Sequence, residues 1–485
     1  MFPASIAQHR QWVMGKLVDK VYPSAAIRVE RIQGVLNVDV LEAALNALLA
    51  RHEALRTCYV EHDGILMQLI QPRSELHLTL VDLRSPENNQ REWDLSLLIQ
   101  QYALMDFDLG KPPLLRFQLL QLGDTDYIFL LAIHHLIADA WSVNVIIREL
   151  SDLYQAFSQG SSTPLPELTV HYSDFAHRQW EWMNGDSIEK LFDYWKTRLA
   201  DLPTVELPTD RRRPAVQSYL GKTMPFEVSP ELALELKNLS QREGVSLSMT
   251  LTAALLTLLH RYSGQEDLVI GTLSSGRRQV GYEGLIGQLA NILLLRSTVS
   301  AEMSFRELLT HVRETTIGAY DNQDMPYAKL VQALHPNTDL SRNPLFQVMF
   351  IFRDAPDATL HLNGMVTEPL SIETLPTPYD LTLELTESRH RLYGKLSYAT
   401  DLFEPASIDR LIGHYLTLLE GIVANPAAHL FELPLLTNHE RQQMLLDWND
   451  TTVEYPHDRF IHEMFEEQVE RTPEEIENKV KPTWV

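Results

Sequence analysis

The stretch at residues 128–142 reads IFLLAIHHLIADAWS, and it joins a strand pattern to a helix pattern through two histidines. The apolar run from Ile128 to Ile133 is continuous and has β-branched and aromatic neighbours, which predicts a buried strand. A helix with one apolar face follows at once, marked by Val143, Ile146, Ile147 and Leu150. A buried strand that runs through a polar turn into a helix favours an α/β fold.

The polar turn carries side chains that could take part in catalysis. His134 and His135 end the predicted strand, and Asp139 follows at the helix start. Because successive strand side chains point to opposite faces, one histidine should face a cleft and the other the interior. A neutral histidine at such a mouth can take a proton from an amine or hydroxyl nucleophile. Structural roles stay open, since a strand-end histidine often only satisfies hydrogen bonds and Asp139 can be a helix cap or the partner of a distant arginine.

Helix and strand patterns alternate along the rest of the chain. Amphipathic helices are expected at residues 38–50, 188–199, 229–242 and 246–260. Asn37, Ser229-Pro230 and Ser246 are typical helix-opening residues. Strands are expected at 267–272 and 381–385. Dense prolines between residues 160 and 215 predict a connection between lobes. The alternation predicts an α/β architecture with two lobes of similar size, followed from Glu440 by a charged tail or the start of a neighbouring domain.

The composition excludes several classes of protein. The 485 residues include 41 Lys+Arg and 65 Asp+Glu, a formal charge of −24, which argues against a nucleic-acid partner. Cys58 is the only cysteine, so neither an internal disulfide nor a cysteine-based metal centre is expected, and no metal site is predicted. A cytoplasmic location fits that count. The N-terminus lacks signal-peptide character, and the longest apolar runs fall short of the ~20 residues that span a bilayer, so no membrane insertion is expected.

Seven stretches, in order along residues 5–347, resemble the motifs of one family, the condensation domains of nonribosomal peptide synthetases. The histidine stretch is similar to the family's HHxxxDGxS signature. The others are SIAQHRQW at residues 5–12, RHEALRT at 51–57, YSDFA at 172–176, IGQLANILLLR at 286–296, NQDMPY at 322–327 and DLSRNPLFQ at 339–347. The motifs at residues 5–12 and 51–57, together with residues 164–179, resemble those of domains that take an L-configured donor and an L-configured acceptor.

The resemblance implies a fold and a reaction. It implies two chloramphenicol-acetyltransferase-like lobes arranged as a V-shaped pseudo-dimer with a central tunnel, over residues 1–175 and 176–436. Residues 437–485 resemble the linker to an adenylation domain. Upstream donor and downstream acceptor carrier proteins would supply 4′-phosphopantetheine arms, and no intrinsic cofactor is expected. The acceptor's amine would attack the donor thioester to form an amide. A monomer is expected.

The resemblance also implies roles for single residues. His135, next to His134, would face the tunnel as a general base or as a group that positions the amine. Asp139 would be structural, with Arg277 as its buried ion-pair partner. Ser142 is a candidate hydrogen-bond donor to the oxyanion, or a structural helix-start residue. The remaining tunnel candidates are Trp141, Arg56 and Asn291.

Two departures from the family pattern predict local changes. Ala140 stands where the family has a glycine, which predicts an altered turn. Gln288, Leu289 and Ala290 replace bulkier residues before Asn291, which predicts an altered tunnel.

Two other functions remain open at this point. One is a non-catalytic relative that recruits a tailoring enzyme or a carrier through the same fold, although the intact His135 and Asp139 argue against it. The other is an acyltransferase that uses coenzyme A, for which no DFGWG-like element is found near the C-terminus.

Overall fold

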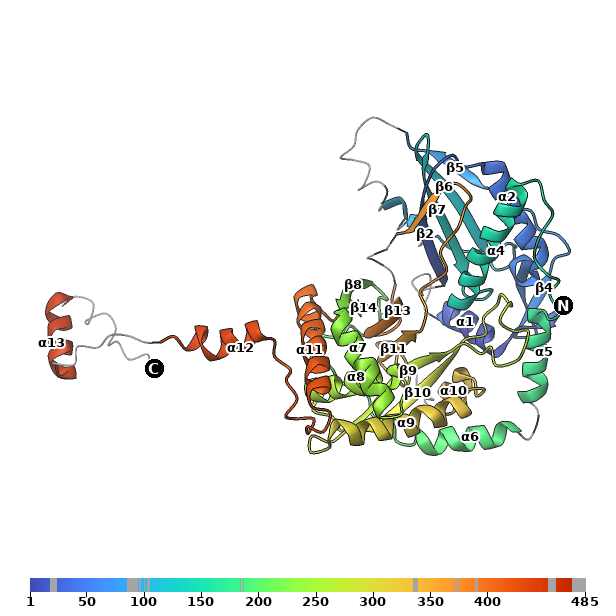
Figure 1. Ribbon diagram of the computed structural model, residues 1–485. Coiled ribbons are helices and arrows are strands. Elements are labelled where there is room, and N and C mark those ends of the chain that lie inside the picture. Colours follow the sequence, from blue (N-terminus) through green and yellow to red (C-terminus); the bar gives the residue numbers. More distant parts are fainter. Residues whose placement is uncertain are drawn as a thin grey trace, which may run out of the picture. The chain divides into compact units, whose positions relative to one another are not determined.

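The computed structural model describes most of the chain, and it divides into two compact units, Met1–Leu435 and Leu436–Val485 (Figure 1). The described residues are 1–17, 24–84, 95, 97–99, 101–102, 105–183, 185, 187–334, 339–370, 372, 374, 376–388, 391–451 and 459–472. The final stretch of the predicted tail, residues 473–485, lies outside them. Each unit is described by itself below.

A five-stranded sheet organises the N-terminal half of the first unit. Its order is β12 (Val366–Pro369), β2 (Ala25–Gln33), β7 (Asp126–His134), β6 (Leu115–Gly123) and β5 (Thr79–Asp82). Helices α2 (Val38–Arg51) and α4 (Ala140–Ser158) lie side by side over one face of this sheet (Figure 1). Their apolar residues, which include Leu45 and Ile146, pack against the sheet in one core cluster.

Strand β7 is buried on both faces, as its continuous apolar run predicts. Phe129, Leu131 and Ile133 belong to the cluster beneath α2 and α4. Ile128 and Leu130 belong to a second cluster on the opposite face. Since side chains alternate between faces, the strand carries both clusters at once. It ends at His134, and His135 is the first residue of the turn that follows.

A six-stranded sheet organises the C-terminal half of the first unit. Its order is β10 (Asn291–Thr298), β9 (Asp267–Ser274), β11 (Val348–Arg353), β13 (Leu381–Ser388), β14 (Arg391–Ala399) and β8 (Gly221–Val228). The helices packed with it are α7 (Pro230–Arg242), α8 (Leu247–Ser263), α9 (Phe305–Asp321) and α11 (Pro405–Ala424). They share one large core cluster with Trp195 of α6 (Ser187–Arg198).

Smaller elements complete the first unit. A three-stranded sheet has the order β1 (Phe2–Pro3), β4 (Ile65–Ile70) and β3 (Thr57–His62). The structure also describes α1 (Ile6–Leu17), the 3₁₀ turn η1 (Glu53–Arg56), α5 (Tyr172–Met183) and α10 (Tyr327–Leu334).

Strand β12 connects the two halves of the first unit. It lies late in the chain, yet it pairs with β2 in antiparallel register, from Val366 opposite Gln33 to Pro369 opposite Glu30. Nearby, Leu360 and Leu362 belong to the core cluster of the N-terminal half. The C-terminal half therefore supplies an edge strand and core residues to the N-terminal sheet.

The predicted α/β class and the predicted helices are confirmed. The oxygen of Asn37 accepts the Val40 N–H at 3.1 Å at the start of α2, and Ser229 and Ser246 cap α7 and α8 in the same way. Residues 161–171 lack helix and strand, whereas α5 and α6 occupy much of the remaining proline-rich region. The lobe boundary at residues 175/176 falls inside α5 and stays a prediction, as does the V-shaped arrangement.

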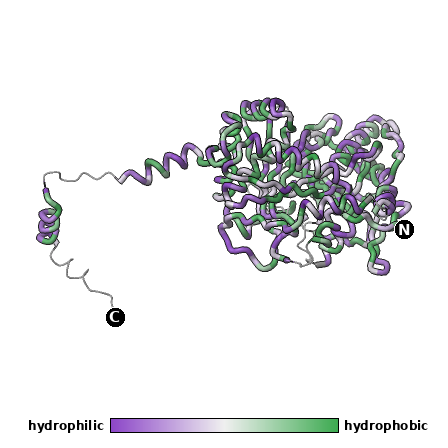
Figure 2. Tube along the Cα trace, turned by 90° about the horizontal axis from the view of Figure 1, so that it is seen from below, coloured by the Kyte–Doolittle hydropathy of each residue, from purple (hydrophilic) through white to green (hydrophobic). Residues whose placement is uncertain are grey.

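The second unit contains α12 (Asn438–Leu445), the 3₁₀ turn η2 (Asp447–Asn449) and α13 (Ile461–Arg471), none of which has a buried residue. Hydrophobic and hydrophilic residues are mixed along both helices (Figure 2). Within the described parts of the chain, no single helix is long and apolar enough to cross a membrane. The consecutive helices α7 and α8 reach that length and apolar composition only when taken together, and a bend of 104° separates them.

Candidate active site

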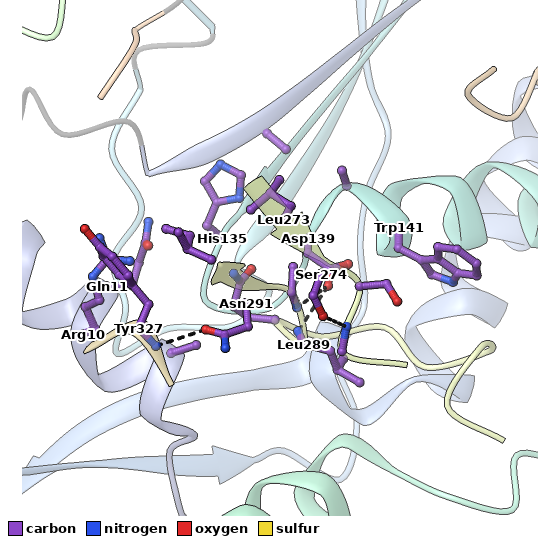
Figure 3. Close-up of a pocket in the computed structure, with 18 of the residues that line it drawn as sticks. Arg10, Gln11, His135, Asp139, Trp141, Leu273, Ser274, Leu289, Asn291 and Tyr327 are labelled. Atoms are coloured by element: carbon purple, nitrogen blue, oxygen red, sulfur yellow. Dashed lines mark hydrogen bonds between the residues drawn. The ribbon is translucent and has the colours of Figure 1, made fainter. Parts of the chain in front are cut away.

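A cavity of about 710 Å³ lies in the first unit, between residues of its two halves. Figure 3 shows the side chains gathered around it, from the end of β7, the start of α4 and the neighbouring strands of the six-stranded sheet. The lining residues most relevant to chemistry are Arg10, His135, Asp139, Trp141, Arg277, Gln288, Asn291 and Tyr327.

His134 faces away from this cavity and into the protein. Its side chain is buried, and its ring packs edge-on against Phe107 with 5.7 Å between ring centroids. Its Nδ1 accepts the Leu136 N–H at 3.0 Å, which requires the neutral ring. Burial lowers the pKa of His134 to about 3, with smaller contributions from the His135 and Arg116 charges. The structure therefore places His134 in a structural position, outside the cavity where a catalytic group would act.

His135 is the histidine that lines the cavity, as the family resemblance implies. Its Nδ1 lies 3.4 Å from the Ala138 carbonyl oxygen, which favours the tautomer with the proton on Nδ1 and a lone pair on Nε2. Burial lowers the pKa of His135, although the Ala138 carbonyl and the Asp139 charge oppose that shift. The ring is thus neutral at neutral pH and able to accept a proton or a hydrogen bond.

Asp139 and Arg277 form the predicted buried ion pair. Two guanidinium nitrogens of Arg277 donate to the two carboxylate oxygens of Asp139 at 2.8 and 3.0 Å. Asp139 also caps α4 through the Ser142 N–H at 2.8 Å and accepts the N–H groups of Leu289 and Ala290 at 3.1 and 3.0 Å. Burial alone would raise the pKa of Asp139, but the Arg277 charge and the hydrogen bonds from Arg277 and Ser142 outweigh it and lower the pKa. The carboxylate therefore stays charged and joins the two halves.

Ser142 lies outside the described residues that line the cavity, and its hydroxyl is engaged within the ion-pair network. The side chain is fully buried, and its hydroxyl lies 2.7 Å from an Asp139 oxygen and 2.9 Å from the Gly287 carbonyl. The same hydroxyl oxygen accepts from Arg277 and from the Gly287 N–H. Its hydrogen-bonding capacity is consumed by the ion-pair network, which is the structural alternative.

Trp141 and Asn291 both line the cavity. The indole N–H of Trp141 donates to the Glu283 carbonyl at 2.8 Å. Asn291 donates to the Met325 carbonyl at 2.7 Å and accepts the Tyr327 N–H at 3.1 Å. Each side chain thus fixes a neighbouring segment of cavity wall.

Arg56 lies outside the set of described residues that line the cavity, and its assignment as a tunnel residue stays a prediction. Its guanidinium donates to the Gln71 carbonyl at 2.5 Å. Glu53, from the same motif, accepts the Ser173 N–H of α5 at 2.9 Å. The RHEALRT motif therefore stabilises the fold, and its sequence alone does not separate that role from a role in the tunnel.

Two small residues near the ion pair, Gly276 and Ala140, differ in their backbone conformation. Gly276 has a φ of +66°, and an added Cβ would meet the Leu289 carbonyl oxygen at 2.1 Å, so this turn requires glycine. Ala140 is the first residue of helix α4 and is exposed at the cavity. It is not among the described residues with positive φ, so its Cβ introduces no backbone strain.

Several residues that support the site were missed by sequence reasoning. Gln8 donates at 2.6 Å to both the Leu136 carbonyl, next to the histidines, and the Tyr59 hydroxyl. Arg10 lies over the Tyr327 ring, 4.6 Å from its centroid, and both line the cavity. Gln8 and Arg10 belong to the opening motif, so their presence in SIAQHRQW was the available signal.

Comparison with known proteins places this architecture. The family model described as "Condensation domain" matches residues 1–445. The chain belongs to the condensation-domain family. It is 40% identical over 480 residues to one component of the linear gramicidin synthase of Brevibacillus parabrevis, covering 98% of this chain and 9% of that protein. It is 41% identical over 485 residues to another component of the same synthase, covering 99% and 6%. The condensation domain therefore spans under a tenth of the length of these relatives.

Solved structures agree with the fold. The X-domain from teicoplanin biosynthesis is 27% identical and superposes with a TM-score of 0.82, covering 90% of this chain and 97% of that one. A holo four-domain nonribosomal peptide synthetase bound to AMP and glycine is 24% identical with a TM-score of 0.84, covering 97% of this chain and 36% of that one. The latter likeness concerns the fold alone. The predicted family and its α/β fold are confirmed.

Proposed function

We propose that this condensation domain forms an amide bond between a donor acyl or peptidyl thioester and the amine of an acceptor aminoacyl thioester. The observation that carries the proposal is the position of His135 on the wall of the cavity, with its Nδ1 directed to Ala138 and its Nε2 lone pair left for a substrate. The kinship to components of a gramicidin synthase supports a peptide product.

The reaction needs little covalent help from the protein. The amine nitrogen attacks the thioester carbonyl carbon, the new C–N bond forms and the C–S bond breaks. The amine loses a proton, and the departing thiolate gains one. His135 serves either as the base that takes the amine's proton or as the acceptor that orients the amine. Alignment of the two reactants can lower the barrier by about 7–11 kcal/mol, so shape and orientation supply much of the catalysis.

The substrates would arrive on partners. In this proposal, upstream donor and downstream acceptor carrier proteins each present a 4′-phosphopantetheine arm to the cavity, and both building blocks have the L configuration. The two lobes at residues 1–175 and 176–436 would surround the cavity. Residues 437–485 would lead to an adenylation domain. Trp141 and Asn291 would shape the walls, while Asp139 and Arg277 would hold the halves around His135.

The test uses two loaded carrier proteins and intact-mass spectrometry of the acceptor carrier. The parent chain, His135→Ala and His62→Ala are compared, because His62 is an exposed histidine at the end of β3 and serves as a matched control. We expect a mass gain with the parent and His62→Ala and little or none with His135→Ala. An equal yield from His135→Ala would contradict both roles of His135.

Two further arms separate the other candidate functions. Coenzyme A thioesters offered without carrier proteins would give product only if the chain is a coenzyme A-dependent acyltransferase. An absence of product from the parent across varied donors would favour the recruitment function.

A further inference from the structure

We propose that Gln288 is a positioning residue that fixes the turn carrying His135 in its reactive geometry. The inference rests on the proposed function. It assigns a role to a residue that the sequence marks only as a departure from the family pattern. Gln288 belongs to the segment at residues 288–290, which comes from the C-terminal half and lines the cavity.

The side-chain amide of Gln288 bridges two carbonyl groups of the histidine turn. With its nitrogen facing the turn, it donates to the His135 carbonyl oxygen at 3.1 Å and to the Ala138 carbonyl oxygen at 3.2 Å. The opposite orientation would place the amide oxygen against two acceptors, so the chemistry selects the bridging one. One side chain thus holds both ends of the turn between β7 and α4.

The second carbonyl connects this bridge to the reactive ring. The Ala138 oxygen that accepts from Gln288 is also the oxygen that faces Nδ1 of His135 at 3.4 Å. That contact selects the tautomer with its lone pair on Nε2. Displacement of the Ala138 carbonyl would therefore change both the tautomer and the direction of the ring, and Gln288 acts on His135 through Ala138.

The bridge starts from a rigid base. The Gln288 carbonyl accepts the Tyr172 hydroxyl at 2.9 Å. The next two backbone N–H groups, of Leu289 and Ala290, bind the Asp139 carboxylate. Because the backbone that carries Gln288 is held at its carbonyl and at the next two N–H groups, the side chain can define the position of the turn instead of following it.

The variants Gln288→Met and Gln288→Glu test this role. Both keep the length of the side chain, and both lack an N–H donor when the carboxyl of the second is ionised. Gln265→Met is the matched control, because Gln265 also bridges two backbone groups, the Thr204 carbonyl and the Glu206 N–H, at a place that does not line the cavity. Loss of the Gln265 amide should lower folding stability without affecting the position of His135.

Two measurements are made on each variant. The first is kcat and KM for amide formation with loaded carriers. We expect kcat to fall by about 10- to 100-fold with a smaller change in KM, because a misplaced reactive group loses orientation rather than binding. The second is the ¹⁵N spectrum of the imidazole rings, with the His135 signals identified by their absence in His135→Ala. We expect the Nδ1–H form in the parent and a mixture of tautomers in both Gln288 variants.

The outcomes are distinguishable. A kcat within twofold of the parent in both variants would overturn the positioning role, as would an unchanged His135 tautomer. A similar loss of kcat in Gln265→Met would also overturn it, since general destabilisation would then explain the effect. If the parent itself forms no product, the proposed function fails, and the tautomer comparison still decides whether Gln288 fixes the turn.

Discussion

Replacement of Asp139 by alanine isolates the contribution of the buried ion pair. The substitution removes a carboxylate that accepts six hydrogen bonds, two from Arg277, two from Ser142 and one each from Leu289 and Ala290. It leaves the Arg277 guanidinium in place, with a side chain only 1% exposed. An unpaired charge then remains in the interior, at the contact between the two halves.

The expected loss of stability is large. Breaking a buried ion pair by removing one partner costs about 3–5 kcal/mol, because the remaining charge stays buried without compensation. The lost helix cap adds to this cost, and such a cap is typically worth about 1 kcal/mol on its own. Folded domains are stable by only about 5–15 kcal/mol, so Asp139→Ala should remove a substantial fraction.

Denaturant unfolding of the parent and the variant measures this loss. The control is Asp324→Ala, which removes the partner of Arg278 from an exposed pair 3.4 Å apart and should cost about 0–1 kcal/mol. A double variant, Asp139→Ala with Arg277→Met, should be less destabilised than the sum of its single changes, because no buried charge remains. A loss below about 1 kcal/mol for Asp139→Ala would refute the reasoning.

Three further predictions follow from the same region. His134→Asn keeps an acceptor for the Leu136 N–H. Because the pKa of His134 is lower in the folded state than in the unfolded state, the parent loses stability as the pH falls from about 6.5 towards 3, and the deficit of the variant relative to the parent should shrink by about 1.4 kcal/mol per pH unit. Denaturant unfolding at several pH values checks this. Gly276→Ala should destabilise by about 1–3 kcal/mol in the same assay, because of its positive φ and the nearby Leu289 carbonyl. His135→Ala should melt within a few degrees of the parent, which calorimetry measures, and a large shift would show that His135 also supports folding.

The sequence predicts the local elements of this fold well and its long-range contacts only in part. Capping residues such as Asn37 and the two-sided apolar run of β7 act over a few residues, so their patterns are visible in the chain. The ion pair between Asp139 and Arg277 was accessible only through a family resemblance. The Gln288 bridge depends on an amide reaching a turn about 150 residues earlier in the chain. Ser142 depends on long-range contacts in the same way, because its hydroxyl bonds Gly287 and Arg277, which lie more than 130 residues later in the chain.

Strand β12 has a consequence for the order in which the chain is made and for where it can be cut. During translation β2 is synthesised long before Val366–Pro369. One edge of β2 therefore stays without its partner strand while more than 300 further residues are made. An unpaired sheet edge of this kind is a template for aggregation. A fragment ending near residue 215 should therefore be poorly soluble. Recombination between synthetases should preserve folding when the crossover falls near Leu435, where the first unit ends, and disrupt it between the two sheets.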